Sequence, residues 1–472
     1  MIWACIVALG HLTGFITSLR ALMEVRTSQG AIAWVLMLNI FPYVSVPAFW
    51  IFGSSKFHGY VRRRRQDMLK TSPVAMRFGE QLVERGLLHG EDREKALLVE
   101  RLAKQPFTNG NEVELLIDGK ATFQSIFDGI DAAREYILVE FYIIHDDGLG
   151  RDLQQRLIAK AREGVRVYVL YDEIGSNGLS KAYQQELHAA GAAIHPFNTS
   201  QWRANRLQLN FRNHRKIVVV DGRYAWVGGH NVGDEYLGLN PIFGAWRDTH
   251  VKVTGPVVPG VQLAFFEDWH WATRHLLKLR WEAEPADTES RCTALCLSSG
   301  PADPLETCTL FFLHIINRAT KRLWIASPYF VPDEQFISAL QLAALRGVDV
   351  RILLPAKPDN LLVSLSAWSF VVDLTHAGVH IHKYTAGFMH QKVVLVDDSY
   401  ATVGTANFDN RSFRLNFELT VVVVSEAFAG KIHQMLEADF ARSKPITAQD
   451  FAKRGFWFRL LTRAARLLAP IQ

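Results

Sequence analysis

Cysteine is scarce in this chain, with four residues in 472: Cys5, Cys292, Cys296 and Cys308. Cys292 and Cys296 are not matched by a second close pair, and no Cys-x-x-Cys is present. The sequence therefore indicates neither a disulfide framework nor a zinc site. Clusters of carboxylates that would suggest Mg²⁺ are missing as well. We expect a protein that works without a metal or another cofactor.

A large excess of one charge is also lacking, because 52 basic residues face 47 acidic ones. A formal net charge of +5 is modest for this length and does not indicate a nucleic-acid-binding protein unless the excess is clustered. It is clustered, in the run Arg62–Arg65 and near the end of the chain, where Arg459, Arg463 and Arg466 lie. A hydrophobic content of 49% excludes a disordered chain, and the length predicts two or three domains.

Long apolar runs are present at the start of the chain. Ile2–Leu19 and Ala31–Phe52, of 18 and 22 residues, approach or reach the length that crosses a hydrocarbon core. The alternatives for the second run are a buried helix and a re-entrant or interfacial segment, because Pro42 and Pro47 would kink or break a helix. A cleaved signal peptide is not indicated, since no Lys or Arg precedes Arg20.

Basic residues around these runs predict their orientation. The loop between the runs carries Arg20 and Arg26, whereas Lys56 and Arg62–Arg65 flank the far end. The positive-inside rule then places both termini and the bulk of a multi-pass protein in the cytoplasm. Arginines directly after an apolar run are typical of contact with anionic headgroups. The tail alternates arginines with an apolar helical face, which predicts a helix on a membrane surface or, alternatively, one packed on the core.

Between these ends the chain repeats itself. Glu135–Ile144 and Arg322–Val331 are each expected to form a buried strand, followed by a helix that ends at Gly164 or Gly347 and by a further strand. The pattern predicts an α/β fold of two fused halves related by a pseudo-twofold axis. The predicted domains are a membrane anchor (1–60), a basic helical linker (61–105), a first α/β half (106–290), a second half (291–450) and a basic amphipathic tail (451–472).

Each half carries a histidine and a lysine two residues apart. His214 and Lys216 precede four apolar residues, and His390 and Lys392 repeat the arrangement 176 residues later. Because side chains i and i+2 of a strand point to the same face, each histidine is expected to project together with its lysine. Asp221-Gly222 after the apolar run predicts a β-hairpin.

That hairpin would return Asn231 to the side of His214, and the equivalent turn at Asp397 would return Asn407 to the side of His390. An imidazole, an ammonium and a carboxamide in one small space suit a phosphodiester. Histidine can act as a nucleophile or a proton donor near neutral pH, and the lysines and asparagines can hold the phosphate oxygens.

An imidazole that attacks phosphorus needs an acceptor for its other nitrogen. Asp248 and Glu418 are the candidates, because each opens a strand some 30 residues beyond the histidine of its own half.

With these residues in place, the sequence resembles the phospholipase D superfamily, whose signature is a duplicated His-Lys-Asp motif. The stretches "GGHNVGDEY" and "GTANFDNRSFRLNFEL" are similar to those of bacterial cardiolipin synthases. The resemblance implies two phospholipase D-like α-β-α sandwich halves and a protein of the bacterial inner membrane. Gly229 stands where the wider superfamily has serine, while Thr405 keeps a hydroxyl in the second half.

The resemblance also implies a two-step transfer. His214 would attack the phosphorus of one phosphatidylglycerol and His390 would protonate the departing glycerol; a second phosphatidylglycerol would then take the phosphatidyl group, giving cardiolipin. The other roles it implies are phosphate binding by Lys216, Lys392, Asn231 and Asn407, with Asp221 and Asp397 as motif aspartates that support the site.

Other functions remain open at this point. A hydrolase of the phospholipase D type, or a transferase using another alcohol such as that of phosphatidylethanolamine, would share the intermediate. A phosphodiesterase acting on nucleic acid is disfavoured by the membrane segments and by the lack of a long basic groove with aromatic residues. A membrane scaffold with a decayed site is disfavoured by the intact motifs. We therefore expect phospholipid substrates, a membrane and no nucleic acid as partners.

Overall fold

The computed structural model describes residues 2–53, 76–90, 93–197 and 210–469. The basic run 62–65 lies outside them. The first half of the body contains, in chain order, β1 (Thr108–Ile117), α6 (Asp118–Ala132), β2 (Tyr136–Phe141), α7 (Gly148–Arg162), β3 (Arg166–Asp172), α8 (Lys181–Ala189), β4 (Ala193–Phe197), β5 (Arg212–Asn213), β6 (Ile217–Val220), β7 (Tyr224–Gly228), a 3-10 turn (Asp234–Leu237), β8 (Trp246–Arg247), β9 (Thr249–Thr254) and α9 (Val258–Thr273).

The second half repeats this order with small additions. It contains β10 (Cys292–Ser299), α10 (Thr307–Arg318), β11 (Arg322–Ala326), β12 (Phe330–Val331), α11 (Glu334–Leu345), β13 (Asp349–Pro355), α12 (Leu361–His376), β14 (His380–Tyr384), β15 (Phe388–Met389), β16 (Val393–Val396), β17 (Tyr400–Gly404), β18 (Phe408–Asp409), α13 (Asn410–Arg414), β19 (Asn416–Val424), α14 (Glu426–Ala441), β20 (Ser443–Ile446), α15 (Ala448–Ala452) and α16 (Phe456–Arg466). Helix α5 (Arg93–Ala103) precedes both halves.

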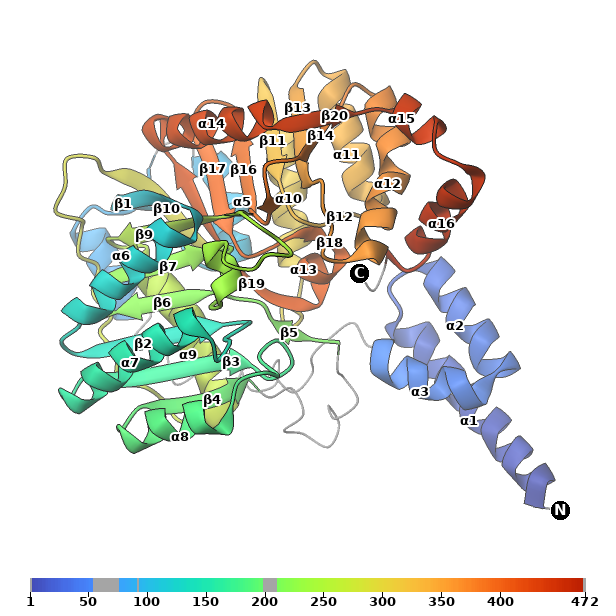
Figure 1. Cartoon of the computed structure of the whole chain (residues 1–472), viewed down its shortest axis with the longest axis horizontal. Helices are drawn as coiled ribbons and strands as arrows, with labels where there is room; N and C mark the ends of the chain where they lie inside the picture. Colours follow the sequence, from blue (N-terminus) through green and yellow to red (C-terminus); the bar gives the residue numbers. More distant parts are fainter. Residues whose placement is uncertain (1, 54–75, 91–92, 198–209, 470–472) are drawn as a thin grey trace.

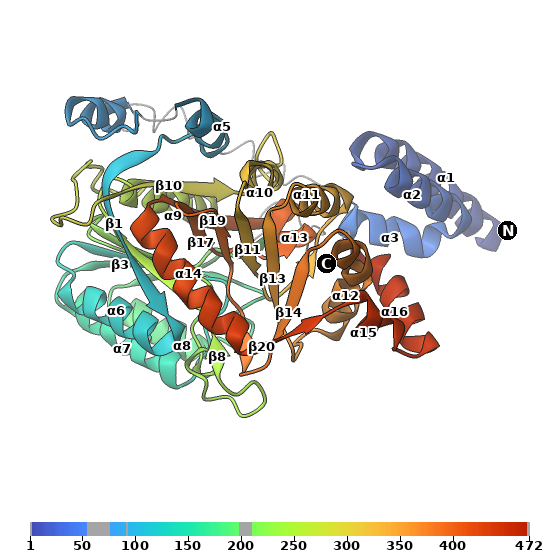
Figure 2. The same cartoon turned by 90° about the horizontal axis from the view of Figure 1, so that it is seen from above.

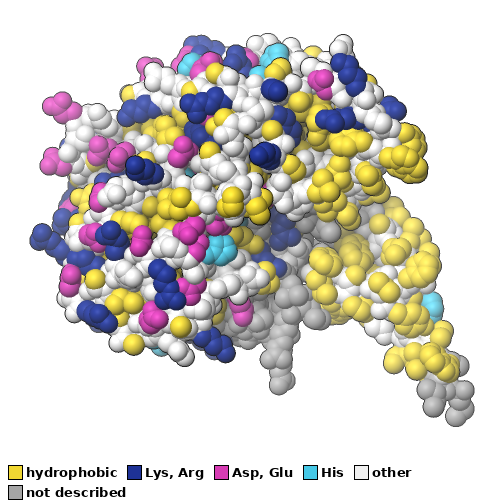
Figure 3. Space-filling view, in the orientation of Figure 1, with side chains coloured by type: hydrophobic (Ala, Val, Ile, Leu, Met, Phe, Trp, Pro, Cys, Tyr) yellow, Lys and Arg dark blue, Asp and Glu magenta, His cyan; other side chains and the backbone are white. Residues whose placement is uncertain are grey.

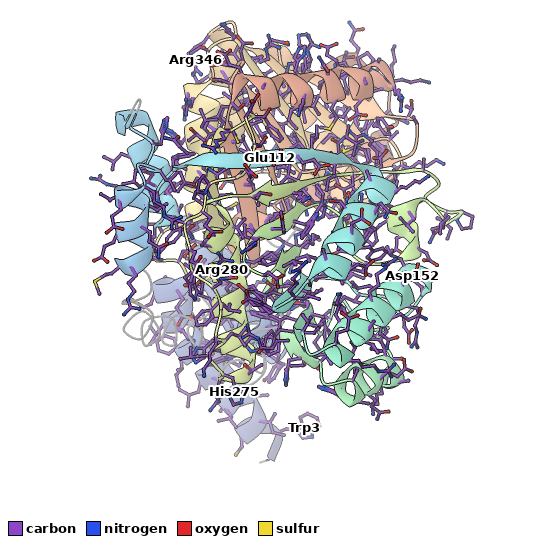
Figure 4. The ribbon with its side chains drawn as sticks, turned by 90° about the vertical axis from the view of Figure 1, so that its left-hand side faces the viewer. Trp3, Glu112, Asp152, His275, Arg280 and Arg346 are labelled. Carbon is purple, nitrogen blue, oxygen red and sulfur yellow. The ribbon has the colours of Figure 1, made fainter. Side chains whose placement is uncertain are left out.

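One continuous sheet joins the halves. Its order is β20-β14-β13-β11-β16-β17-β19-β10-β1-β9-β7-β6-β2-β3-β4, which reads alike outward from the centre in both directions. The halves meet where β1 and β10 pair antiparallel. Figure 4 shows β1, on which Glu112 is labelled, running between the two halves. The α/β duplication with pseudo-twofold symmetry is thus confirmed.

Helices cover both faces of the sheet. Apolar residues of α6, α7 and α8 form the core on one side of the first half, and those of α10, α11 and α12 do so in the second. Helices α9 and α14 cover the remaining face, and their core cluster includes strand residues from both halves. Figure 2 shows α14 crossing the sheet obliquely. The shared core fixes the two halves relative to each other, so a site at their junction can be rigid.

The N-terminal apolar runs differ from each other in structure. The first is one helix, α1 (Ile2–Glu24), which is long and apolar enough to cross a membrane. The second is divided at Phe41 into α2 (Ser28–Ile40) and α3 (Pro42–Phe52). Proline at the first position of α3 has no N–H to continue the ladder of α2, which explains the break. The prediction of two membrane helices is therefore met only for α1.

Candidate active site

The two histidines lie on the connections between a short strand and the longer strand that follows. His214 links β5 to β6, and its backbone N–H donates to Phe417 O of β19 at 3.0 Å. His390 links β15 to β16, and its N–H donates to Arg247 O of β8 at 2.8 Å. Strands β5 and β19 pair in parallel, as do β15 and β8. Each histidine is thus attached to a strand of the opposite half.

Glu418 holds the ring of His214. The imidazole Nδ1 lies 3.0 Å from both carboxylate oxygens. The carboxylate is itself fixed by the Thr405 hydroxyl, which donates to Oε2 at 2.6 Å, and by the Asn416 amide, which donates to Oε1 at 3.2 Å. Glu418 is fully buried, so this set of bonds leaves the imidazole little freedom to turn.

Asp248 holds the ring of His390. Its Oδ2 lies 2.8 Å from Nδ1 of the imidazole, and its Oδ1 accepts from the Thr249 N–H at 2.8 Å. A β-carbon on Gly229 would lie 1.9 Å from Asp248 Oδ1. The carboxylate of the first half therefore occupies the space that a serine side chain would need, which explains why Gly229 stands where Thr405 stands in the second half.

Both candidate carboxylates bind a histidine, but the pairing crosses between the halves. Their sequence positions suggested that Asp248 would serve His214 and Glu418 would serve His390. The parallel strand pairs place each carboxylate next to the other half's histidine instead. Neither half alone contains a complete histidine–carboxylate pair.

The protonation of these pairs follows from burial and charge. Burial lowers the pKa of His214 and of His390 to about 4. Nearby His214 and Lys216 help hold the pKa of Glu418 at about 2 despite its burial, and Lys392 with His230 lowers that of Asp248. At neutral pH each carboxylate is charged and each imidazole neutral. Each Nδ1–H then donates to its carboxylate and leaves an unprotonated Nε2.

The two lysines bring positive charge to the same place. Burial lowers the pKa of Lys216 to about 7 and that of Lys392 to about 8. Lys392 also contributes to lowering the pKa values of His214 and Lys216, so the two motifs form one electrostatic unit. Lys216 Nζ donates to His214 O at 2.7 Å, whereas Lys392 Nζ lies 2.7 Å from Nδ1 and 3.2 Å from Nε2 of His390.

The two asparagines are buried beside this charge. Asn231 accepts from the Ile143 N–H at 3.2 Å and donates to the Tyr236 hydroxyl at 2.8 Å. Asn407 Oδ1 is buried without a hydrogen-bond partner among the described residues. The ring centroid of Tyr236 lies 6.5 Å from that of His390. The tyrosine that Asn231 binds therefore also contacts the histidine of the second half.

The motif aspartates lie away from the histidines. Asp221 and Gly222 both have positive φ, 53° and 65°, in the three-residue connection between β6 and β7, where the Arg223 N–H closes a β-turn on Val220 O at 3.0 Å. The Asp221 carboxylate accepts the N–H groups of residues 134, 135 and 136. Asp397 does the same for residues 320, 321 and 322. Both therefore fasten a hairpin to the start of a neighbouring strand, a contact suited to the supporting role that the resemblance implies for these aspartates.

Sequence reasoning missed the anchors of the residue between each histidine and lysine. Arg215 forms a buried ion pair with Asp268 of α9. In the second half Gln391 donates to Asp439 of α14 at 2.8 Å. The two acids stand near the ends of equivalent helices, so the repeat could have shown them. It also missed Tyr142, whose ring lies 5.1 Å from that of His214.

Known proteins are similar to this chain in sequence. A family model described as "Cardiolipin synthase, PLD-like domain" matches residues 126–241 and 312–442, one match in each half. Cardiolipin synthase A of Pseudomonas entomophila (strain L48) is 49% identical over 99% of this chain and 98% of that relative. The chain belongs to the cardiolipin synthase family. Cardiolipin synthase A of Pseudomonas putida (strain W619) is 48% identical over the same shares of the two chains.

A solved structure extends the likeness to the fold. A phosphatidylserine synthase of Haemophilus influenzae Rd KW20 superposes with a TM-score of 0.62, covering 80% of this chain and all of that one. The identity is 15%, so this match speaks for the fold alone. The family match and the duplicated sheet agree on a phospholipase D-like body in this cardiolipin synthase family member.

Proposed function

We propose that the protein is a cardiolipin synthase that moves a phosphatidyl group from one phosphatidylglycerol to another. The observation that carries the proposal is the exchange of carboxylates, Glu418 onto His214 and Asp248 onto His390. Because of this exchange, two oriented imidazoles and two lysines form one site. The chain that carries this site is 49% identical to a cardiolipin synthase A. A two-step transfer needs one histidine as nucleophile and one as acid and base.

The first step forms a phosphohistidine. His214 Nε2 attacks phosphorus, the bond to the glycerol oxygen breaks, and an imidazolium at His390 gives its proton to that oxygen. The anionic phosphodiester favours the charged form of His390, which is neutral in the empty site at neutral pH. Lys216, Lys392 and the two asparagines, Asn231 and Asn407, stabilise the charge that develops on the phosphate oxygens.

The second step reverses these roles. Neutral His390 takes the proton of a hydroxyl on the second phosphatidylglycerol while that oxygen attacks phosphorus and the bond to His214 Nε2 breaks. Cardiolipin leaves, and His390 is again protonated for the next glycerol. Each proton that His390 gives in the first step returns in the second, so the cycle needs no cofactor.

The assignment of His214 as nucleophile is supported by the lysines. Lys392 Nζ lies within 3.2 Å of both ring nitrogens of His390. An ammonium there lowers the basicity of the ring and makes its protonated form a stronger acid, which suits the proton donor. Lys216 and Lys392 each donate to the backbone carbonyl of their own histidine, but among the described residues only Lys392 also contacts the ring nitrogens of its histidine.

The membrane is the proposed location of this reaction, with the body in the cytoplasm of a bacterium. Helix α1 supplies an apolar anchor, and exposed apolar side chains continue over α16, among them Trp457 and Leu461 (Figure 3). Arginines of the same helix can meet anionic headgroups. We propose the tail from residue 451 as a surface contact with the bilayer that supplies both substrates.

The test is product analysis with a defined lipid. Purified protein would be incubated with phosphatidylglycerol labelled in its glycerol headgroup, with a chelator of divalent cations. Cardiolipin and free glycerol in equal amounts are expected, and His214→Ala should form neither. Phosphatidic acid with no cardiolipin would identify a hydrolase. Release of ethanolamine after addition of phosphatidylethanolamine would show that this lipid serves as an alternative phosphatidyl donor.

A further inference from the structure

The second apolar run folds as a helical hairpin. Helices α2 and α3 meet at Phe41 and Pro42, and Trp34 and Phe49, which stand nearly the same distance before and after that turn, contact each other with ring centroids 5.2 Å apart. At 1.5 Å per residue the two helices are about 20 and about 17 Å long, whereas a hydrocarbon core is about 30 Å thick. Neither helix can cross it alone.

Contacts with α1 fix the depth of this hairpin. A β-carbon on Gly14 would lie 2.1 Å from Leu38 O, and one on Gly10 would lie 2.5 Å from the ring of Tyr43, so the turn packs against the first part of α1. At the other end, the guanidinium of Arg20 lies 4.5 Å above the ring of Trp50. Helix α3 therefore returns to the level at which α1 ends, and α1 extends past the turn.

Three N–H groups of the turn between α2 and α3 are paired within the protein. The N–H of Phe41 donates to Met37 O at 2.9 Å, those of Val44 and Ser45 donate to Phe41 O, and Pro42 has no N–H to satisfy. Non-helical backbone is tolerated at membrane depth where its polar groups are paired or packed on protein, and these bonds together with the packing on α1 favour such a location. Asn39 is paired as well, with Ser18 Oγ of α1 at 2.7 Å.

The turn between α1 and α2 is attached to the two-half body. Arg26 Nε lies 2.7 Å from Glu306 Oε1 and Arg26 Nη1 lies 3.5 Å from Asp333 Oδ2. Both acids are also bound by Arg414 of α13. Figure 4 shows Trp3, near the start of α1, at the far end of the anchor from the body. Figure 1 shows the same separation of the N-terminus from the body.

We propose that only α1 crosses the bilayer, and that α2 and α3 enter and leave it from the face on which the body lies. The N-terminal end of α1 is then on the opposite face. This arrangement places Arg20, Arg26, Lys56 and Arg62–Arg65 on one side, while no Lys or Arg precedes Arg20. The positive-inside rule is satisfied better by this topology than by two spans, which would separate Arg20 and Arg26 from the other basic residues. The inference depends on the anchor alone and stands or falls separately from the chemistry.

Single cysteines can test the proposal in the full chain. The background would be Cys5→Ala with Cys292→Ser, because Cys296 and Cys308 are buried. Lys431→Cys, on an exposed position of α14, marks the face of the body, and Gln29→Cys marks the turn between α1 and α2. A membrane-impermeant maleimide would be applied to sealed spheroplasts and to inside-out vesicles, with retained synthesis of cardiolipin or thermal stability as the folding control.

The decisive result is the comparison of these two positions. We expect residues 29 and 431 to react in the same preparation, Trp3→Cys to react in the other one, and Tyr43→Cys to react only after solubilisation. Reaction of residues 29 and 431 in opposite preparations would establish two spans and overturn the proposal. Reaction of residue 29 only in detergent would also overturn it, since the turn that carries Arg26 must lie in water.

Discussion

Glu418 of the second half binds Nδ1 of His214 in the first, with both carboxylate oxygens at 3.0 Å. In the same way, Asp248 of the first half binds Nδ1 of His390 in the second half, at 2.8 Å. The exchange means that the chemistry of each histidine depends on the half to which it does not belong. It also gives a reason for the fusion of the halves in one chain, because a half alone would leave a buried carboxylate without its imidazole.

The exchanged pairs predict which carboxylate serves which step. With a phosphatidyl ester of p-nitrophenol, whose leaving group needs no proton, formation of the phosphohistidine should depend on His214 and Glu418 but not on Asp248. Glu418→Gln should slow release of p-nitrophenolate by about 10²- to 10⁴-fold, since the imidazole loses its orientation and charge stabilisation. Stopped-flow absorbance measures this rate.

Asp248→Asn is the matched control for that experiment. It should keep most of the rate with the p-nitrophenyl ester and lose most of it with phosphatidylglycerol, whose glycerol must be protonated. The opposite pattern, with Asp248→Asn slow on both and Glu418→Gln fast on the activated ester, would make His390 the nucleophile.

Gly229 and Thr405 occupy equivalent positions in the two halves. We expect a serine side chain to be damaging at position 229 and tolerated at position 405. Gly229→Ser should displace the Asp248 carboxylate, because the added β-carbon would lie 1.9 Å from Oδ1. A fall in kcat of at least about 10²-fold on phosphatidylglycerol is expected, the cost of a general acid. Thr405→Ser keeps the hydroxyl that donates to Glu418 and should stay within a few-fold of the parent. Equal activity of the two variants would contradict the packing argument.

The buried lysines and histidines predict an activity profile shifted to low pH. His214 must be neutral to attack, and its pKa falls from 6.5 to about 4, so the acid limb of kcat/KM should move below pH 6.5. Lys216 and Lys392 must be charged to hold phosphate, and their pKa values fall from 10.5 to about 7 and about 8. In the lipid-bound protein, where the phosphodiester favours the charged form of His390, loss of the lysine protons should start the alkaline limb of kcat near pH 7 to 8. Full activity at pH 9.5 in mixed micelles would contradict this; Lys216→Arg should move the alkaline limb upward.

Local patterns were sufficient to predict most of the fold. The helix ends at Gly164 and Gly347 and the turn at Asp221 lie where the sequence placed them, since turn chemistry acts over a few residues. The predicted strand 135–144 is shorter, as β2 (Tyr136–Phe141), and the predicted strand Arg322–Val331 is divided into β11 and β12, which belong to different sheets. The exchange of Asp248 and Glu418 could not be predicted in this way, because it depends on parallel pairing between strands 142 and 204 residues apart.

The N-terminal anchor is a second feature that local sequence patterns do not predict. Hydropathy alone made residues 31–52 long enough to span a membrane, and Pro42 offered only an alternative. The direction of α3 is decided by tertiary contacts, Trp34 with Phe49 and Arg20 with Trp50, which no window of sequence reports.

The buried pair of Arg215 and Asp268 predicts a large effect on stability. The side chains are 3% and 0% exposed, so Asp268→Asn should lower the free energy of unfolding by about 3 to 5 kcal/mol, because the buried guanidinium loses the negative charge of that carboxylate while its other hydrogen bonds remain. Lys321 and Asp398 form an exposed pair at 2.5 Å, and Asp398→Asn should cost less than about 1 kcal/mol. Thermal unfolding in detergent compares them, and a cost of Asp268→Asn no larger than that of Asp398→Asn would contradict the argument.

The tail helix α16 predicts an effect that depends on the lipid phase. Its buried face packs on α12 through Thr462 and Ala465, while Leu460 and Leu461 are 47% and 55% exposed. The double substitution Leu460→Glu and Leu461→Glu should lower cardiolipin synthesis on vesicles by about 3- to 10-fold, because charge replaces apolar area that would enter the interface.

The same variant should keep its activity in detergent micelles, where no flat bilayer has to be engaged. A matched pair of substitutions is available on α11, since Leu342 and Leu345 are 55% and 72% exposed near its C-terminal end. Leu342→Glu with Leu345→Glu should leave both assays unchanged. If it lowers vesicle activity as much as the α16 pair does, the effect is one of added negative charge and α16 has no special contact with the membrane.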